Sequence, residues 1–120
     1  MAAKFTELVV DANDVEALAN FWVAVLGWER RPTNDPGDVE IGPPDGSIPT
    51  IVFEPVAEPK QVKDRLHIDV SPSGTDQATE LQRLLALGAT RVDIGQGDVS
   101  WVVLADPEGN EFCLLHDPVA

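Results

Sequence analysis

The stretch Arg65-Leu66-His67-Ile68-Asp69-Val70 decides the fold, because polar and apolar residues alternate along it. In an extended strand this alternation places Arg65, His67 and Asp69 on one face and the three apolar side chains on the other. The apolar face can pack against a helix, whereas the polar face is costly to bury unless its charged groups have partners or a ligand. The stretch therefore predicts a strand with one face toward the core and the other toward a site.

The same stretch begins the second copy of an internal repeat. Leu26-Gly27 precedes Leu87-Gly88 by 61 residues, Gly37-Asp38-Val39 precedes Gly97-Asp98-Val99 by 60, and Pro44-Asp45-Gly46 precedes Pro107-Glu108-Gly109 by 63. Three matches in order at nearly one offset indicate two related halves, and the alternative is a chance alignment of turn residues. Each half is expected to contain a strand, a helix and three further strands.

The first half is expected to carry its helix between Asn13 and Gly27. Asn13 is the predicted N-cap, Glu16 would complete a capping box, and Gly27 would end the helix in a left-handed conformation. Its predicted apolar stripe is Val15, Leu18, Phe21, Trp22, Val25 and Leu26. Strands are predicted at 5–12, 28–32, 38–41 and 51–53, and prolines at 55 and 59 are expected to interrupt the sheet.

The second half is expected to repeat this order after a turn at 71–74. Its helix would begin near Thr75 or Asp76 and end at Gly88. The predicted apolar stripe of that helix is Ala78, Leu81, Leu84 and Leu85. Strands are predicted at 65–70, 90–94, 99–104 and 111–116.

A single helix covers only one face of a four-stranded sheet, so each module leaves one face open. We predict an α+β fold of two paired βαβββ modules that form a curved mixed sheet around a cleft, with one helix per module on the outer face. Glu7, Val9 and Asp11 would face the cleft from the first strand. On the last strand we favour Glu111, Cys113 and Leu115 over Phe112, Leu114 and His116. One domain is expected over 1–120, with modules at about 1–56 and 64–120 and a linker at about 57–63.

Composition limits the classes of partner. The chain has 8 basic and 21 acidic residues, a net charge of −13, and such a surface repels the phosphates of nucleic acids. No apolar run approaches the length of a membrane span, and the N-terminus has no stretch resembling a signal peptide. The single cysteine fits a reducing compartment. We therefore expect a cytoplasmic protein that binds neither nucleic acid nor membrane.

Several motifs together resemble those of the vicinal oxygen chelate superfamily, in particular its glyoxalase-like, bleomycin-resistance-like and dioxygenase-like members. They are the helix 14–28 with Phe21-Trp22 and Leu26-Gly27-Trp28, the strand with His67 and Asp69, Leu87-Gly88-Ala89, and the turn Asp106-Pro107-Glu108-Gly109-Asn110. The resemblance covers nearly the whole chain and is greatest to a glyoxalase-like subgroup without an assigned reaction. It implies the fold of two paired βαβββ modules.

The resemblance also implies a divalent metal ion (Zn, Ni, Fe or Mn) in the metal-dependent relatives, held by the first, fourth, fifth and eighth strands. The matching positions are Glu7, His67 and, on the eighth strand, Cys113, where those enzymes have a carboxylate. The fourth-strand position lies within 52–54, where only Glu54 could bind a metal. We favour the alternative without a metal, in which Cys113 is a small buried apolar residue and His67 a hydrogen-bonded cleft residue.

Without a metal, His67 is the candidate general base, and Glu7 could act instead in a desolvated cleft. Asp11 or Asp69 could hold the imidazole in place. Arg65 would anchor an anionic ligand group or pair with a nearby acid. Trp101 would stack on a flat ligand, or belong to the core or to a dimer interface.

Two functions follow from the resemblance. One is a glyoxalase-like protein with a small-molecule cleft, as a metal-dependent lyase, isomerase or dioxygenase whose metal site is degraded. The other is non-catalytic binding of a small molecule, as in antibiotic-resistance relatives. A homodimer is expected by analogy with the fold alone.

Overall fold

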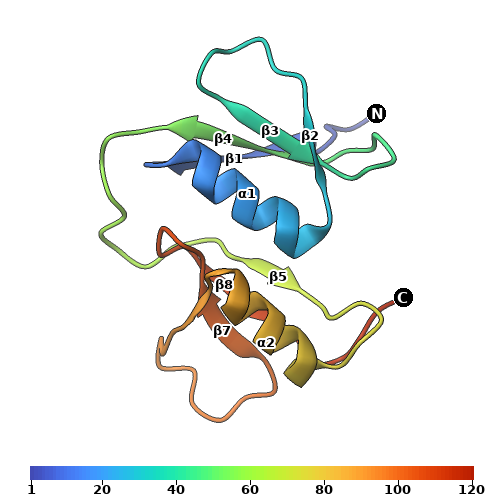
Figure 1. Ribbon diagram of the computed structural model, residues 1–120, viewed down its shortest axis with the longest axis vertical. Helices are drawn as coiled ribbons and strands as arrows, with labels where there is room; N and C mark the ends of the chain where they lie inside the picture. Colours follow the sequence, from blue (N-terminus) through green and yellow to red (C-terminus); the bar gives the residue numbers. More distant parts are fainter. The chain divides into compact units, whose positions relative to one another are not determined.

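The computed structural model describes residues 1–120, and the chain divides into two compact units, Met1–Pro59 and Lys60–Ala120 (Figure 1). Each unit contains one helix and a four-stranded mixed sheet. The predicted α+β class with two βαβββ modules is therefore confirmed. The assignment of both modules and their linker to one domain stays a prediction.

The first unit holds β1 (Glu7–Ala12), α1 (Val15–Leu26), β2 (Glu29–Arg31), β3 (Val39–Gly42) and β4 (Thr50–Pro55). Its strands lie in the order β1-β4-β3-β2. β1 runs parallel to β4, and the other neighbours are antiparallel. The strand that precedes the helix therefore pairs with the last strand of the unit.

The second unit repeats this topology. It holds β5 (Ile68–Val70), α2 (Gln77–Leu87), β6 (Thr90–Arg91), β7 (Val102–Ala105) and β8 (Glu111–Leu114). Its strands lie in the order β5-β8-β7-β6, with β5 parallel to β8 and the other neighbours antiparallel. Identical topology in both units supports the internal repeat.

The N-cap of α1 differs from the prediction. Asp14, not Asn13, caps the helix, and its carboxylate accepts a hydrogen bond from the Ala17 amide at 3.1 Å. The Asn13 side chain instead donates to the carbonyls of Val56 and Glu58, at 3.0 Å each, and so ties the segment after β4 to the start of the helix. Asn13 is thus committed to a tertiary contact, which leaves the cap to its neighbour.

The remaining helix signals give a mixed result. Glu16 forms an ion pair with Arg30. Gly27 ends α1 with φ +65°, as predicted, and Asp76 caps α2 by accepting from the Thr79 amide at 2.8 Å. A helix cap depends on hydrogen bonds between residues close in the chain, so most caps can be predicted from the sequence.

The core of each unit lies between its helix and one face of its sheet. Five of the six predicted α1 residues are buried, and Leu26 is half-buried. In α2 only Leu81 and Leu84 are buried, because Leu85 is half-buried and the predicted Ala78 is exposed. Phe53 in β4 and Phe112 in β8 are almost fully buried. The helix-facing predictions hold better in the first unit than in the second.

Strands of the second unit are shorter than predicted. β5 begins at Ile68, so Arg65, Leu66 and His67 precede it, and Leu66 is 79% exposed rather than packed against a helix. The strand is short because its pairing with β8 begins at Ile68, opposite Phe112, and the residues before Ile68 have no partner in β8. β6 has two residues, and Trp101 lies just before β7 rather than within a strand.

The two sheets correspond residue by residue. The offset of 61 residues between the repeats matches Arg30 with Arg91. From this pair, strand pairing runs through Ile41 and Ile51 to Leu8 in the first sheet, and through Leu104 and Phe112 to Ile68 in the second. Glu7 therefore occupies the place of His67, and Val52 the place of Cys113. The same correspondence matches Thr50 with Glu111.

Candidate functional site

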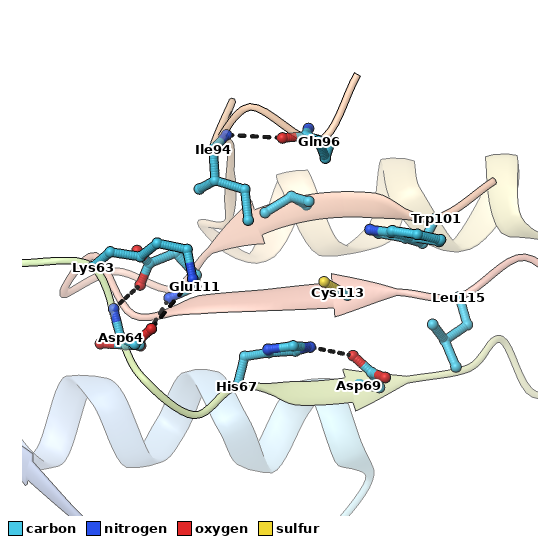
Figure 2. A pocket seen from close by; sticks show the side chains of 11 residues that line it. Lys63, Asp64, His67, Asp69, Ile94, Gln96, Trp101, Glu111, Cys113 and Leu115 are labelled. Atoms are coloured by element: carbon cyan, nitrogen blue, oxygen red, sulfur yellow. Dashed lines mark hydrogen bonds and ion pairs between the residues drawn. The ribbon is translucent and has the colours of Figure 1, made fainter. Parts of the chain in front are cut away.

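A pocket of about 420 Å³ lies on the face of the second sheet opposite the buried Phe112 and Leu114 (Figure 2). Its lining residues are Lys63, Asp64, His67, Asp69, Ile94, Gln96, Trp101, Val103, Glu111, Cys113 and Leu115. The set that we favoured on the last strand, Glu111, Cys113 and Leu115, is the set that faces this pocket. Strand alternation explains this, because these positions are one residue out of phase with the core.

His67 and Asp69 form the polar edge of the pocket. They lie two residues apart, so both point to the same face, and the Nε2 atom of His67 is 3.0 Å from Oδ1 of Asp69. A carboxylate can only accept a hydrogen bond, so Nε2 carries the hydrogen and Nδ1 is the basic nitrogen of the neutral ring. Both side chains are about half exposed, 49% and 47%, and can therefore reach a ligand.

Cys113 lies beside Asp69 in the ladder of β5 and β8, and only 7% of its surface is exposed. Burial raises the pKa of the Cys113 thiol, the negative charge of Asp69 and a hydrogen bond to Asp69 raise it further, and Lys63 opposes the effect. Cys113 is therefore a thiol that donates to the Asp69 carboxylate. This arrangement does not make it the activated nucleophile of a cysteine–histidine pair, which requires a thiolate.

Trp101 forms the opposite wall of the pocket. Figure 2 shows the indole on one side of Cys113 and the pair His67–Asp69 on the other. Trp101 is 41% exposed, and the apolar side chains of Ile94, Val103 and Leu115 complete this wall. Trp101 is thus neither a core residue nor fully exposed, which suits a side chain that packs against a ligand.

A loop between β6 and β7 supplies part of the apolar wall. The Gln96 side chain accepts from the Ile94 amide at 2.8 Å and donates to the Val92 carbonyl at 3.3 Å. These bonds fold the loop upon itself and fix Ile94 at the rim. No pattern in the sequence predicts this contact.

A carboxylate pair fixes the segment that leads into His67. The Asp64 amide donates to Glu111 at 3.3 Å, and the Glu111 amide donates to Asp64 at 3.1 Å. The Lys60 ammonium lies 3.2 Å from Glu111 and 3.9 Å from Asp64. We call Lys60, Asp64 and Glu111 the carboxylate clamp.

The two carboxylates of the clamp are not equivalent. Burial, followed by the charge of Glu111, raises the pKa of Asp64. Burial also disfavours ionisation of Glu111, but hydrogen bonds to its backbone and carboxylate and the Lys60 charge outweigh it, so the pKa of Glu111 is lowered. The site therefore favours the ionised form of Glu111, next to Lys60, and disfavours that of Asp64.

The structure brings together four of the predicted site residues, His67, Asp69, Trp101 and Cys113. Arg65 is exposed and does not line the pocket. The site residues that sequence reasoning missed are chiefly Lys63 and Asp64, which precede β5, and Ile94 and Gln96 in the loop between β6 and β7.

Glu7 and Asp11 are exposed residues of β1 in the first unit. They share a face with Glu54, whose pKa is raised by partial burial and by the neighbouring carboxylates Asp38 and Asp11. A role for Glu7 or Asp11 in one site with His67 stays a prediction.

The residues present do not reproduce the metal site that the resemblance implies. The fourth-strand position equivalent to Cys113 is Val52, which has no ligand atom, and the eighth-strand position has a thiol instead of a carboxylate. A different donor set exists within the second unit, because ligand atoms of His67, Asp69 and Cys113 lie within 4.8 Å of one another.

Neither helix has the length and apolar character needed to cross a membrane. A comparison with curated proteins gives no match in sequence. Among solved structures, the chain is similar to a glyoxalase/bleomycin resistance protein/dioxygenase family enzyme from Burkholderia phytofirmans, with 17% identity and a TM-score of 0.68 over 98% of this chain and 100% of that one. These values show a shared fold.

Fosfomycin resistance proteins have the same fold. FosX from Listeria monocytogenes is 14% identical, with a TM-score of 0.71 over 98% of this chain and 93% of that one. FosX from Mesorhizobium loti is 14% identical, with a TM-score of 0.69 over 95% of this chain and 92% of that one. The sequence profile of the glyoxalase-like domain matches residues 7–115. The chain therefore belongs to the glyoxalase-like domain family of the vicinal oxygen chelate superfamily.

Proposed function

We propose that this protein binds a small organic molecule in the pocket of its second unit. The observation that carries the proposal is the pairing of a half-exposed indole, Trp101, with a half-exposed hydrogen-bonding pair, His67 and Asp69, on opposite sides of one pocket. Small-molecule sites combine largely apolar walls with a few placed polar groups. A volume of about 420 Å³ lies within the range of such sites.

The polar groups define what the ligand must offer. The Nδ1 atom of His67 and the Asp69 carboxylate both accept hydrogen bonds, so a ligand with a donor group is favoured. The indole of Trp101 favours a flat or cationic part of the ligand. The net charge of −13 also attracts cations over anions.

Binding is favoured over metal-dependent catalysis because the carboxylates of the expected metal site are replaced by Val52 and Cys113. The resistance proteins with this fold make sequestration or modification of an antibiotic-type compound a reasonable role. We further propose a cytoplasmic homodimer, by analogy with the fold, and sedimentation analysis tests the dimer.

The second candidate function is catalysis of the lyase, isomerase or dioxygenase type. One observation favours it. Asp69 accepts from Nε2 of His67, so in the neutral ring Nδ1 is the nitrogen that can take up a proton, as a general base must. Turnover of a bound ligand that is lost in His67→Gln, while binding persists, would establish this function.

A screen of flat, cationic and donor-bearing compounds by thermal shift, with and without EDTA, tests the binding proposal. Hits are then titrated against wild type, Trp101→Leu and His67→Gln. We expect each substitution to weaken binding at least tenfold, about 1.4 kcal/mol.

The matched control is His116→Gln. His116 also pairs with an aspartate, Asp117 at 2.9 Å, but it does not line this pocket. Equal binding by wild type and this variant is expected. Hits whose affinity is unaffected by Trp101→Leu and His67→Gln would contradict the proposal.

A further inference from the structure

We infer that the second unit alone forms a site for a thiophilic divalent cation, with His67, Asp69 and Cys113 as ligands and no ligand from β1 or β4. The inference is independent of the organic ligand proposed above. It differs from the arrangement that the resemblance implies, because Asp69 replaces a first-strand ligand.

Three kinds of donor converge in this cluster. An imidazole nitrogen, a carboxylate oxygen and a sulfur lie within 4.8 Å of one another, and Asp69 and Cys113 are direct neighbours in the ladder. Ligand atoms around a tetrahedral Zn²⁺ lie roughly 3.5 Å apart, given metal–ligand bonds of about 2.0–2.3 Å. The cluster therefore needs to contract by about 1 Å on binding, taking the same bond lengths.

The side chains that must move are the ones that can. His67 and Asp69 are about half exposed, whereas Cys113 is nearly buried and fixed by β8. At present Asp69 faces the imidazole at 3.0 Å and holds the thiol by a hydrogen bond. A dication would take the place of these hydrogens at the centre of the cluster.

The rest of the sheet explains why the second unit would act alone. The position of Cys113 in the first sheet is Val52, and the position of Asp69 is Val9, so the equivalent cluster in the first unit has only Glu7 as a donor. The equivalent positions of the first unit therefore cannot form the same cluster of three ligands.

The donor set selects the metal. A thiolate with an imidazole and one carboxylate suits Zn²⁺ and Co²⁺, whereas Mg²⁺ and Mn²⁺ favour oxygen ligands. Three protein ligands leave a fourth position open toward the pocket, where water or a ligand donor can bind.

Titration of the metal-free full-length chain with Co²⁺ tests the inference. We expect a thiolate-to-cobalt charge-transfer band that saturates at one ion per chain and disappears on addition of Zn²⁺. Cys113→Ser should abolish the band, and Asp69→Asn should weaken Co²⁺ binding at least tenfold. His116→Gln, which alters the other histidine–aspartate pair, should behave as wild type.

Glu7→Gln separates this site from one that uses the first strand. Unchanged Co²⁺ affinity supports the inference, and a tenfold loss would overturn it. Protection of Cys113 from alkylation by Zn²⁺, but not by Mg²⁺, provides a second readout on the unsubstituted chain. Absence of both the band and the protection would also overturn the inference, whatever the outcome for organic ligands.

Discussion

The two units have the same sheet and differ on the face that their helix leaves open. In the first unit Val9 and Val52 take the places of Asp69 and Cys113, and the acids Glu7, Glu40 and Glu54 surround them. In the second unit the ligand atoms of Asp69 and Cys113 share one pocket with an apolar wall that includes Trp101.

This exchange of polar and apolar positions shows how a duplicated scaffold can specialise. Residues on the helix-facing side remain apolar in both units, because they form the core. Residues on the opposite side can change without loss of that core. Only the second unit therefore combines ligand atoms with a wall against which a small molecule can pack.

The largest expected loss of stability comes from the apolar core, which both units have. Phe112→Ala and Phe53→Ala each remove an almost fully buried ring, and each should lower the free energy of unfolding by about 3–5 kcal/mol. Urea denaturation measures this loss. A cost below about 1 kcal/mol for either variant would show that its ring is not central to a core.

The carboxylate clamp should contribute more to the free energy of unfolding than its counterpart in the first sheet. Lys60→Met leaves the Glu111 carboxylate, 9% exposed, without its cation, and should cost about 1–2 kcal/mol. In the equivalent place Thr50 donates to Glu40 at 2.8 Å, and Thr50→Val should cost about 1 kcal/mol or less. The comparison would fail if urea denaturation gave the larger loss for Thr50→Val.

The two helix caps provide the next test. Asp14→Ala should destabilise the protein by about 1 kcal/mol, because the Ala17 amide loses its acceptor. In α2, the hydrogen bonds from Thr79 lower the pKa of Asp76 below its ordinary value.

The pH dependence at Asp76 has a definite sign. A lowered pKa stabilises the fold above the ordinary pKa of an aspartate, and this stabilisation is lost as the pH falls through the lowered pKa. Asp76→Asn keeps a cap but removes the charge. The difference in melting temperature between this variant and wild type should therefore shrink from pH 7 to pH 3, and a constant difference would contradict the assignment.

The smallest effect is expected from the acidic rim of the first sheet. Partial burial and nearby carboxylates raise the pKa of Glu54, so its ionised form disfavours folding as the pH rises through the ordinary and then the raised value. Glu54→Gln should raise the melting temperature slightly at pH 7 and leave it unchanged at pH 3. A lower melting temperature at pH 7 would instead mean that the carboxylate stabilises the fold.

Much of the fold could be predicted from the sequence, because its signals are local. The apolar stripe of α1, the stop at Gly27 and the repeated order of elements all depend on neighbouring residues. The failures are residues whose state depends on distant partners. Asn13 binds the segment after β4, and Leu66 is exposed because no strand pairs with it.

The sequence alone determined the family, the two related modules and the face on which His67, Asp69 and Cys113 lie, since alternation and repetition are properties of the chain itself. Only the tertiary structure decided that Asp69 binds both His67 and Cys113, that Trp101 lies opposite them, and that Val52 occupies the place of Cys113 in the first sheet. The physical reason is strand register, which brings together residues far apart in the chain and depends on the packing of whole strands.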